Sequence, residues 1–138
     1  MKKALVILLV ITVFFGCKIN QRKNNMRQGH WIERDTINKI VYKSKGRYKN
    51  DEEIKTWKFY RNNKISKIEK YENNICMVTT FYPNGKIESK GQTNVEISST
   101  QRHWFYFGDW TFFDEKNQIY LIRTYEKGVL KKETAFKN

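Results

Sequence analysis

Cys17 is the residue whose position in this sequence points most clearly to chemistry. It follows Gly16 at the end of a predominantly apolar run over residues 4–15, and two lysines precede that run. A basic segment, an apolar segment and a small residue at a cleavage site, in this order, make a secretory signal. The apolar run is shorter than the roughly 20 residues that a membrane-spanning helix needs. The sequence therefore predicts that residues 1–16 are a signal peptide.

Residues 14–17 (sequence FFGC) resemble the lipobox of bacterial lipoproteins, whose cysteine is lipidated and becomes the mature N-terminus. Gly16 is small, as the motif requires, while Phe14 stands where the family usually has leucine. The resemblance implies that Cys17 carries a diacylglycerol and usually a third acyl chain, and several chains together make a stable anchor. It implies a lipid-anchored protein of the cell membrane or the outer membrane, facing the periplasm or the exterior. The outer membrane is favoured because Lys18 stands where lipoproteins held at the inner membrane often have aspartate. The alternative is a plain signal peptide beside a core cysteine.

The other chemically capable residues match no catalytic or metal-binding motif. His30 and His103 stand alone, without the second ligand at close spacing that zinc sites have. Asp109 with Asp114 or Glu115 would supply the two carboxylates of a glycosidase, but acidic residues in turns usually have turn roles. The sequence shows no phosphate loop, nucleophile elbow or dinucleotide fingerprint. We therefore expect no enzyme activity, no catalytic residues, no metal and no cofactor.

The chain is strongly basic. Beyond residue 16 it holds 25 of the 27 Lys and Arg side chains and all 14 acidic ones, within 122 residues that suffice for one domain. Such a charge favours acidic partners, and export argues against nucleic acid. Because the basic residues are dispersed, solvated strand faces account for most of them. The expected partners are the membrane, through the covalent lipid, and an unknown, acidic protein.

Two segments follow the signal peptide. Residues 17–28 are polar and basic, which predicts a flexible tether that begins at the lipidated cysteine. Residues 29–138 alternate β-branched and aromatic residues with charged ones and are broken by Asn, Gly and Asp, which predicts antiparallel β-structure. Cys76 lies in an apolar run of this domain and is expected to be a small buried hydrophobe, without a disulfide partner if Cys17 is acylated.

A repeated turn organises the β-domain. The windows 57–65, 79–87 and 110–119 each run from an aromatic pair through an asparagine-containing turn to isoleucine. Asn84-Gly85 is expected to form a tight type I′ hairpin turn, which Asn62-Asn63 and Asn117 form less easily. Adjacent strand residues point to opposite faces, so one aromatic of each pair is expected in the core, together with Trp57 and Trp110.

Residues 81–87 (FYPNGKI) and 108–117 (GDWTFFDEKN) resemble the MORN-repeat variant of exported bacterial lipoproteins and of proteins named as YwqK-like antitoxin components. The resemblance spans about residues 29–130, with residues 92–101 as an insertion. It implies an all-β fold in which antiparallel β-hairpin repeats stack into an elongated, twisted sheet. It also implies a non-enzymatic binding module of the cell envelope, and we expect Tyr60, Tyr82 and Phe113 to be its interaction aromatics, although most aromatics are core. The alternative is an antitoxin or immunity protein that neutralises a toxin by binding it.

Overall fold

The protein is all-β, as the sequence predicts. The computed structural model describes residues 18–99 and 101–137, so the expected signal peptide and Cys17 lie outside the described residues. Ten antiparallel strands form one open sheet in which each strand pairs with the next along the chain. The strands are β1 (Gln21–Lys23), β2 (Met26–Ile37), β3 (Ile40–Lys49), β4 (Glu52–Arg61), β5 (Lys64–Glu72), β6 (Ile75–Phe81), β7 (Ile87–Ile97), β8 (Arg102–Phe113), β9 (Ile119–Glu126) and β10 (Val129–Ala135).

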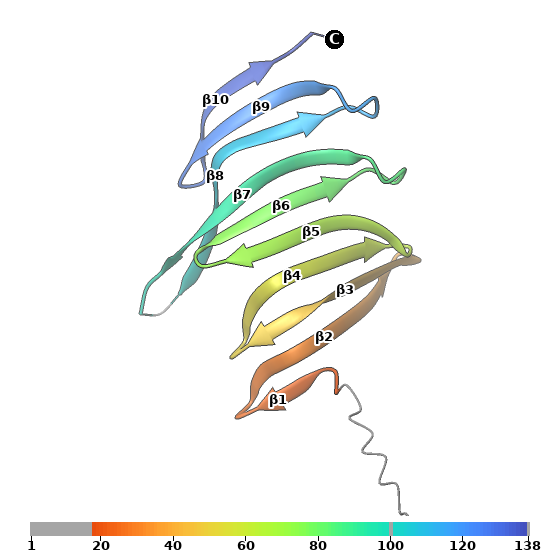
Figure 1. Ribbon diagram of the computed structural model, residues 1–138, viewed down its shortest axis with the longest axis vertical. Helices are drawn as coiled ribbons and strands as arrows, with labels where there is room; N and C mark the ends of the chain where they lie inside the picture. The colour runs from red at the N-terminus through yellow and green to blue at the C-terminus, as the bar shows by residue number, and fades with distance from the viewer. Residues whose placement is uncertain (1–17, 100, 138) are drawn as a thin grey trace, which may run out of the picture.

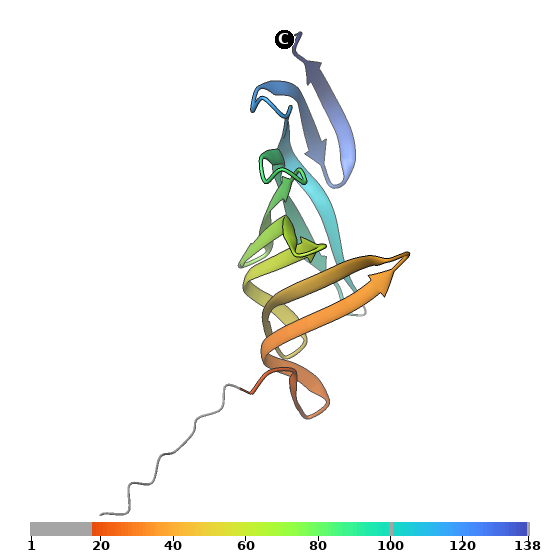
Figure 2. The same ribbon diagram turned by 90° about the vertical axis from the view of Figure 1, so that its right-hand side faces the viewer.

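The strands stack along the long axis of the molecule, and the sheet twists strongly between β1 and β10 (Figures 1 and 2). No second layer of strands or helices covers the sheet within the described residues. The three repeat windows of the sequence are the hairpins β4–β5, β6–β7 and β8–β9, whose turns lie along one side of the sheet. The elongated hairpin array expected from the sequence is therefore confirmed.

The hairpin turns follow the asparagines, but the type I′ turn is not at the expected place. Asn62 and Asn63 both have positive φ (49° and 62°), as a two-residue type I′ turn requires, and they join β4 to β5. At the β6–β7 turn only Gly85 has positive φ (86°), and its N–H donates to the carbonyl of Tyr82 at 2.9 Å. The fixed φ of Pro83 suits the first central position of a type I turn, so the central residues are Pro83 and Asn84, one position closer to the N-terminus than expected.

The sheet buries its two inner tryptophans against its own backbone. Trp57 (2% exposed) and Trp110 (6%) lie flat over Gly46 and Gly91 of the neighbouring strands. A Cβ atom on either glycine would stand 2.1 Å from the ring, so only glycine permits the contact. Cys76 is equally buried (2%). The expected burial of these two tryptophans and of the cysteine is confirmed.

The ordered sheet begins before residue 29, although the sequence predicts a flexible tether up to residue 28. Strand β1 pairs with the start of β2, between Gln21 and Gln28. The side-chain amide of Asn20 both donates to the carbonyl of Ile32 (2.9 Å) and accepts from its N–H (2.8 Å), as a strand backbone would. Ile19 and Met26 are the only large apolar residues of the segment and both are exposed, so backbone and amide hydrogen bonds, rather than apolar burial, hold it on the sheet.

Candidate functional site

The two faces of the sheet differ in chemistry. Residues directly opposite each other on paired strands share a face. On one face, here called the aromatic face, the rings of Trp31, Tyr48, Trp57 and Phe59 form a chain with centroid separations of 5.6, 4.7 and 6.3 Å. Further ring contacts continue it over the other half of the sheet: Tyr71–Trp104, Tyr106–Trp110 and Tyr106–Tyr125.

Several charges on the aromatic face are compensated. Arg27 lies 3.9 Å from the ring centroid of Tyr48, and its Nε lies 2.8 Å from Oδ1 of Asp51. Hydrogen bonds from Arg27 lower the pKa of Asp51, while burial raises the pKa of Tyr48 to about 12. Lys67 likewise lies over a ring and pairs with Glu69 at 2.6 Å. This face is thus packed, and part of its charge is balanced, although Arg61 and Lys64 stand directly opposite each other on it.

The opposite face carries uncompensated positive charge. We call it the basic face and define it by six of the cationic side chains that β2–β5 place there: Arg34, Lys43, Lys45, Arg47, Lys58 and Lys70. A seventh, Lys49, stands directly opposite Glu52. Two like-charged pairs stand directly opposite each other, Arg34 with Lys43 and Lys45 with Lys58. Like charges in this arrangement destabilise a sheet. In the part of the chain that the structure describes, none of the six forms an ion pair.

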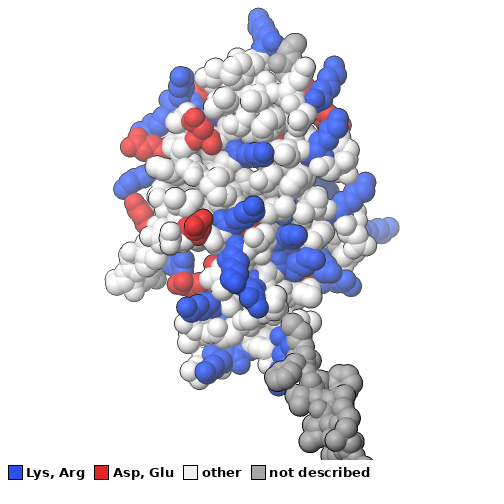
Figure 3. Space-filling model, viewed as in Figure 1, with Lys and Arg blue, Asp and Glu red and all other residues white. Residues whose placement is uncertain are grey.

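The charge is concentrated in the first half of the sheet. Residues 18–72 contain sixteen Lys and Arg and seven Asp and Glu, a net charge of +9, whereas residues 73–138 contain nine and seven, a net charge of +2. Figure 3 shows basic side chains gathered over the lower part of the molecule, where β2–β5 lie in Figure 1. The overall dispersion of Lys and Arg along the sequence therefore hides a strong asymmetry in space.

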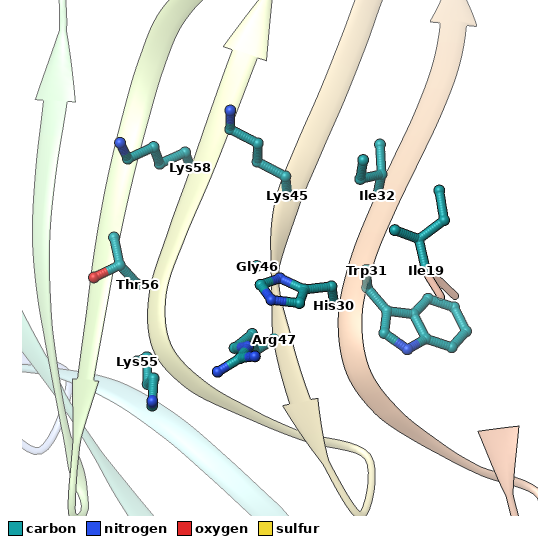
Figure 4. A pocket seen from close by; sticks show the side chains of 10 residues that line it. All are labelled: Ile19, His30, Trp31, Ile32, Lys45, Gly46, Arg47, Lys55, Thr56 and Lys58. Atoms are coloured by element: carbon teal, nitrogen blue, oxygen red, sulfur yellow. The ribbon is translucent and has the colours of Figure 1, made fainter. Parts of the chain in front are cut away.

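A groove of about 600 Å³ lies on this half of the sheet, over β2, β3 and β4 (Figure 4). It is lined by Ile19, His30, Trp31, Ile32, Lys45, Gly46, Arg47, Lys55, Thr56 and Lys58. Four of the ten lining residues are Lys or Arg, and none is acidic. Nε of Arg47 is buried and has no hydrogen-bond partner among the described residues. The groove therefore offers several unengaged donors to an anion.

The three expected interaction aromatics do not form one cluster. Tyr82 and Phe113 are joined, because the Tyr82 hydroxyl donates to the Phe113 carbonyl at 2.7 Å. Tyr60 lies on the basic face, with Nζ of Lys45 at 5.3 Å from its ring centroid. All three are only half-buried, and all three stand at the side of the sheet that carries the repeated turns. Their role in binding stays a prediction.

The residues considered for acid–base chemistry have structural partners. Oδ1 of Asp114 accepts the N–H groups of Lys116 (2.9 Å) and Gln118 (2.8 Å), which is the turn role that the sequence favoured. Asp109 accepts from the hydroxyl of Thr124 at 2.5 Å. The described residues contain no group of three or more His, Cys, Asp or Glu side chains placed to hold a metal ion.

Sequence reasoning missed both the glycines under the tryptophans and the basic groove. A signal for the glycines exists, because the tripeptide Ser-Lys-Gly recurs at residues 44–46 and 89–91, one strand before each buried tryptophan. The groove has no such signal. Its cations come from two strands, and only the register of β3 against β4 brings Lys45 opposite Lys58.

Comparison with known protein families, with curated proteins and with solved structures found no match. No helix in the described part of the chain has the length and apolar character needed to cross a membrane. The fold and the site therefore define this protein only as a single-layer antiparallel sheet of hairpins with one basic face.

Proposed function

We propose that this protein is a membrane-tethered, non-enzymatic binding module of the cell envelope that holds an acidic partner on its basic face. The observation that carries the proposal is the set of six unpaired cations on β2–β5, which includes two like-charged pairs directly opposite each other. Such pairs reduce stability, and departures from the rules of stable sheets concentrate at functional sites. An acidic partner would supply the missing counter-charges.

The single-layer architecture supports the same proposal. The strands of an open sheet leave their side chains accessible over a long surface, and rigid strands hold the charges at fixed spacings of about 4.8 Å across the sheet. Complementary charge of this kind accelerates association and selects partners by sign. The tether part of the proposal is supported by the lipobox resemblance at Cys17, and the binding role by the resemblance to MORN-repeat proteins.

Affinity capture with the lipidated full chain tests the binding role. Lys43→Glu/Lys70→Glu reverses two charges of the basic face, while Lys116→Glu/Lys132→Glu reverses two exposed charges on the other half of the sheet. We expect the first variant to lose a salt-sensitive partner that the wild type and the second variant retain. Equal capture by all three proteins would refute the role of the basic face. Intact-mass analysis tests the tether separately, since an unmodified Cys17 thiol would refute acylation.

An antitoxin is the second candidate, and the concentration of charge in one half of the sheet favours it. A compact basic surface suits the one-to-one occlusion of a single acidic protein. Co-expression with the product of a neighbouring gene distinguishes the two candidates: a toxic neighbour that this chain neutralises would identify an antitoxin, whereas a harmless neighbour would leave the envelope binding role.

A further inference from the structure

The groove on the basic face has the properties of a site for a small, multiply charged anion. We propose that it binds a phosphate group, either as free phosphate or as a phosphoester. This inference goes beyond the proposed function, because it concerns a small anion rather than an acidic protein and does not depend on Cys17.

The first argument is the one-sided charge of the groove. Lys45, Arg47 and Lys58 project from β3 and β4, and His30 projects from β2 toward Arg47, as Figure 4 shows. Four other grooves on the sheet each include at least one Asp or Glu side chain in their walls. The groove over β2–β4 includes none. Several cations without a carboxylate create a local field that attracts anions.

The second argument is that these cations are not needed to build the groove. A β-bulge interrupts the β3–β4 register between Lys45 and Arg47, at the glycine that Trp57 covers, and the indole N–H donates to the carbonyl of Arg47 at 3.1 Å. We call this combination of a bulge, a glycine and a covering tryptophan a unit. A second unit lies in β7–β8, where Trp110 covers Gly91 and its indole N–H donates to the carbonyl of Gln92 at 3.0 Å. The backbone of the two units is therefore held in the same way.

The side chains of the two units differ where the groove lies. In the second unit, Gln92 stands in place of Arg47, and Thr111 in place of Lys58. Met77 faces Gln92 as His30 faces Arg47. The second unit thus keeps the bulge and the buried tryptophan without the cluster of cations. Since the packing tolerates neutral residues at these positions, the cations of the first unit are explained by a ligand.

The third argument is the chemistry of the donors. Arg47 has a planar guanidinium, which can engage two phosphate oxygens at once, and lysines bind phosphate as point charges. The buried Nε of Arg47 lacks a hydrogen-bond partner, so a ligand that reorients the guanidinium can satisfy it. A phosphate group carries up to two charges and three acceptor oxygens, whereas a carboxylate carries one charge. Several cations along one groove without a carboxylate favour the more highly charged group.

The test uses the full chain and a variant copied from the second unit. Arg47→Gln/Lys58→Thr places there the side chains that β7–β8 already carries on the same backbone, so it is expected to fold. Lys90→Gln/Lys116→Gln removes two charges elsewhere and leaves the net charge of the two variants equal. Circular dichroism and urea unfolding confirm that both variants are folded before binding is measured.

Two arms distinguish the sources of phosphate. One measures binding of inorganic phosphate by calorimetry. The other measures the preference for vesicles that contain phosphatidic acid, a phosphomonoester, over vesicles of equal surface charge that contain phosphatidylglycerol, a diester whose phosphate carries one charge. We expect the wild type and the charge-matched control to bind in at least one arm. The affinity of Arg47→Gln/Lys58→Thr is expected to be lower by about tenfold or more, because this variant loses hydrogen bonds from charged groups. Binding in the first arm identifies free phosphate as the source, and binding in the second arm alone identifies a lipid phosphoester.

Two results would overturn the proposal. One is equal binding by the two variants, or none by the wild type, in both arms. The other is that poly-L-glutamate binds the wild type more tightly than either phosphate probe does, and does not bind Arg47→Gln/Lys58→Thr. That result would make the groove part of the surface for an acidic protein.

Discussion

Replacing Gly46 with alanine is expected to be among the most damaging small changes to this protein. The added Cβ atom would stand 2.1 Å from Cδ2 of Trp57 and 2.3 Å from Cε2, so the indole ring has to move. Overpacking of this kind typically costs about 1–3 kcal/mol. Displacing the ring also breaks the bond from its N–H to the Arg47 carbonyl, at about 1 kcal/mol. We therefore expect a loss of roughly 2–4 kcal/mol from a domain stability of about 5–15 kcal/mol.

Urea unfolding of Gly46→Ala, Trp57→Ala and the double variant measures this effect. Gly46 does not have positive φ, so its backbone accepts alanine once the ring is absent. In the Trp57→Ala background, Gly46→Ala is expected to be neutral, or to stabilise by about 0.4–1 kcal/mol through the unfolded chain. If Gly46→Ala costs the same free energy with and without the indole, close stacking is not the reason for glycine at this position.

Three further outcomes are expected. Asn63→Ala, at φ 62°, should destabilise by about 1–2 kcal/mol in urea unfolding, while Asn63→Gly should not; equal losses would contradict the type I′ assignment. Burial raises the pKa of Cys76 to about 11, so iodoacetamide should label this thiol slowly in the native protein and rapidly in urea. Peptide mass mapping separates its labelling from that of Cys17. Rapid labelling of the native protein would show that the thiol is accessible. Burial also raises the pKa of Tyr48 from 10.0 to about 12, and that of Cys76 from 9.0, so the folded state retains protons that the unfolded state releases. The stabilisation from these two groups should be complete below about pH 9 and fall as the pH rises toward 12. In Tyr48→Phe the fall should be less steep. A midpoint of urea unfolding that does not change with pH over this range would contradict the burial of both groups.

The fold could be predicted because its determinants are local. Alternating β-branched and aromatic residues specify strands, and asparagines with tolerance for positive φ specify hairpin turns, so each hairpin is encoded by neighbouring residues. The error at Asn84-Gly85 had a local cause as well. Pro83 fixes its own φ and selects a type I turn, and a rule for asparagine–glycine pairs that ignores the preceding residue misplaces the turn.

The site could not be predicted because it depends on register. Lys45 and Lys58 are thirteen positions apart, and the pairing that brings them opposite each other includes a bulge between Lys45 and Arg47. One residue of slip would send Lys58 to the aromatic face. The sequence showed a large positive charge, but only the paired strands show that unpaired cations gather on one face of one half of the sheet.

The order of the strands has a consequence for how the protein folds and changes. Every strand pairs with its sequence neighbour, so forming each new pair closes only a short loop and costs little chain entropy. Folding can begin at any hairpin and propagate in both directions, as in repeat proteins. By the same reasoning, inserting or deleting one whole hairpin changes strand partners only at the junction and leaves all other pairs as they are. The length of the sheet is therefore free to vary in units of two strands beyond β4, while the groove over β2–β4 stays intact.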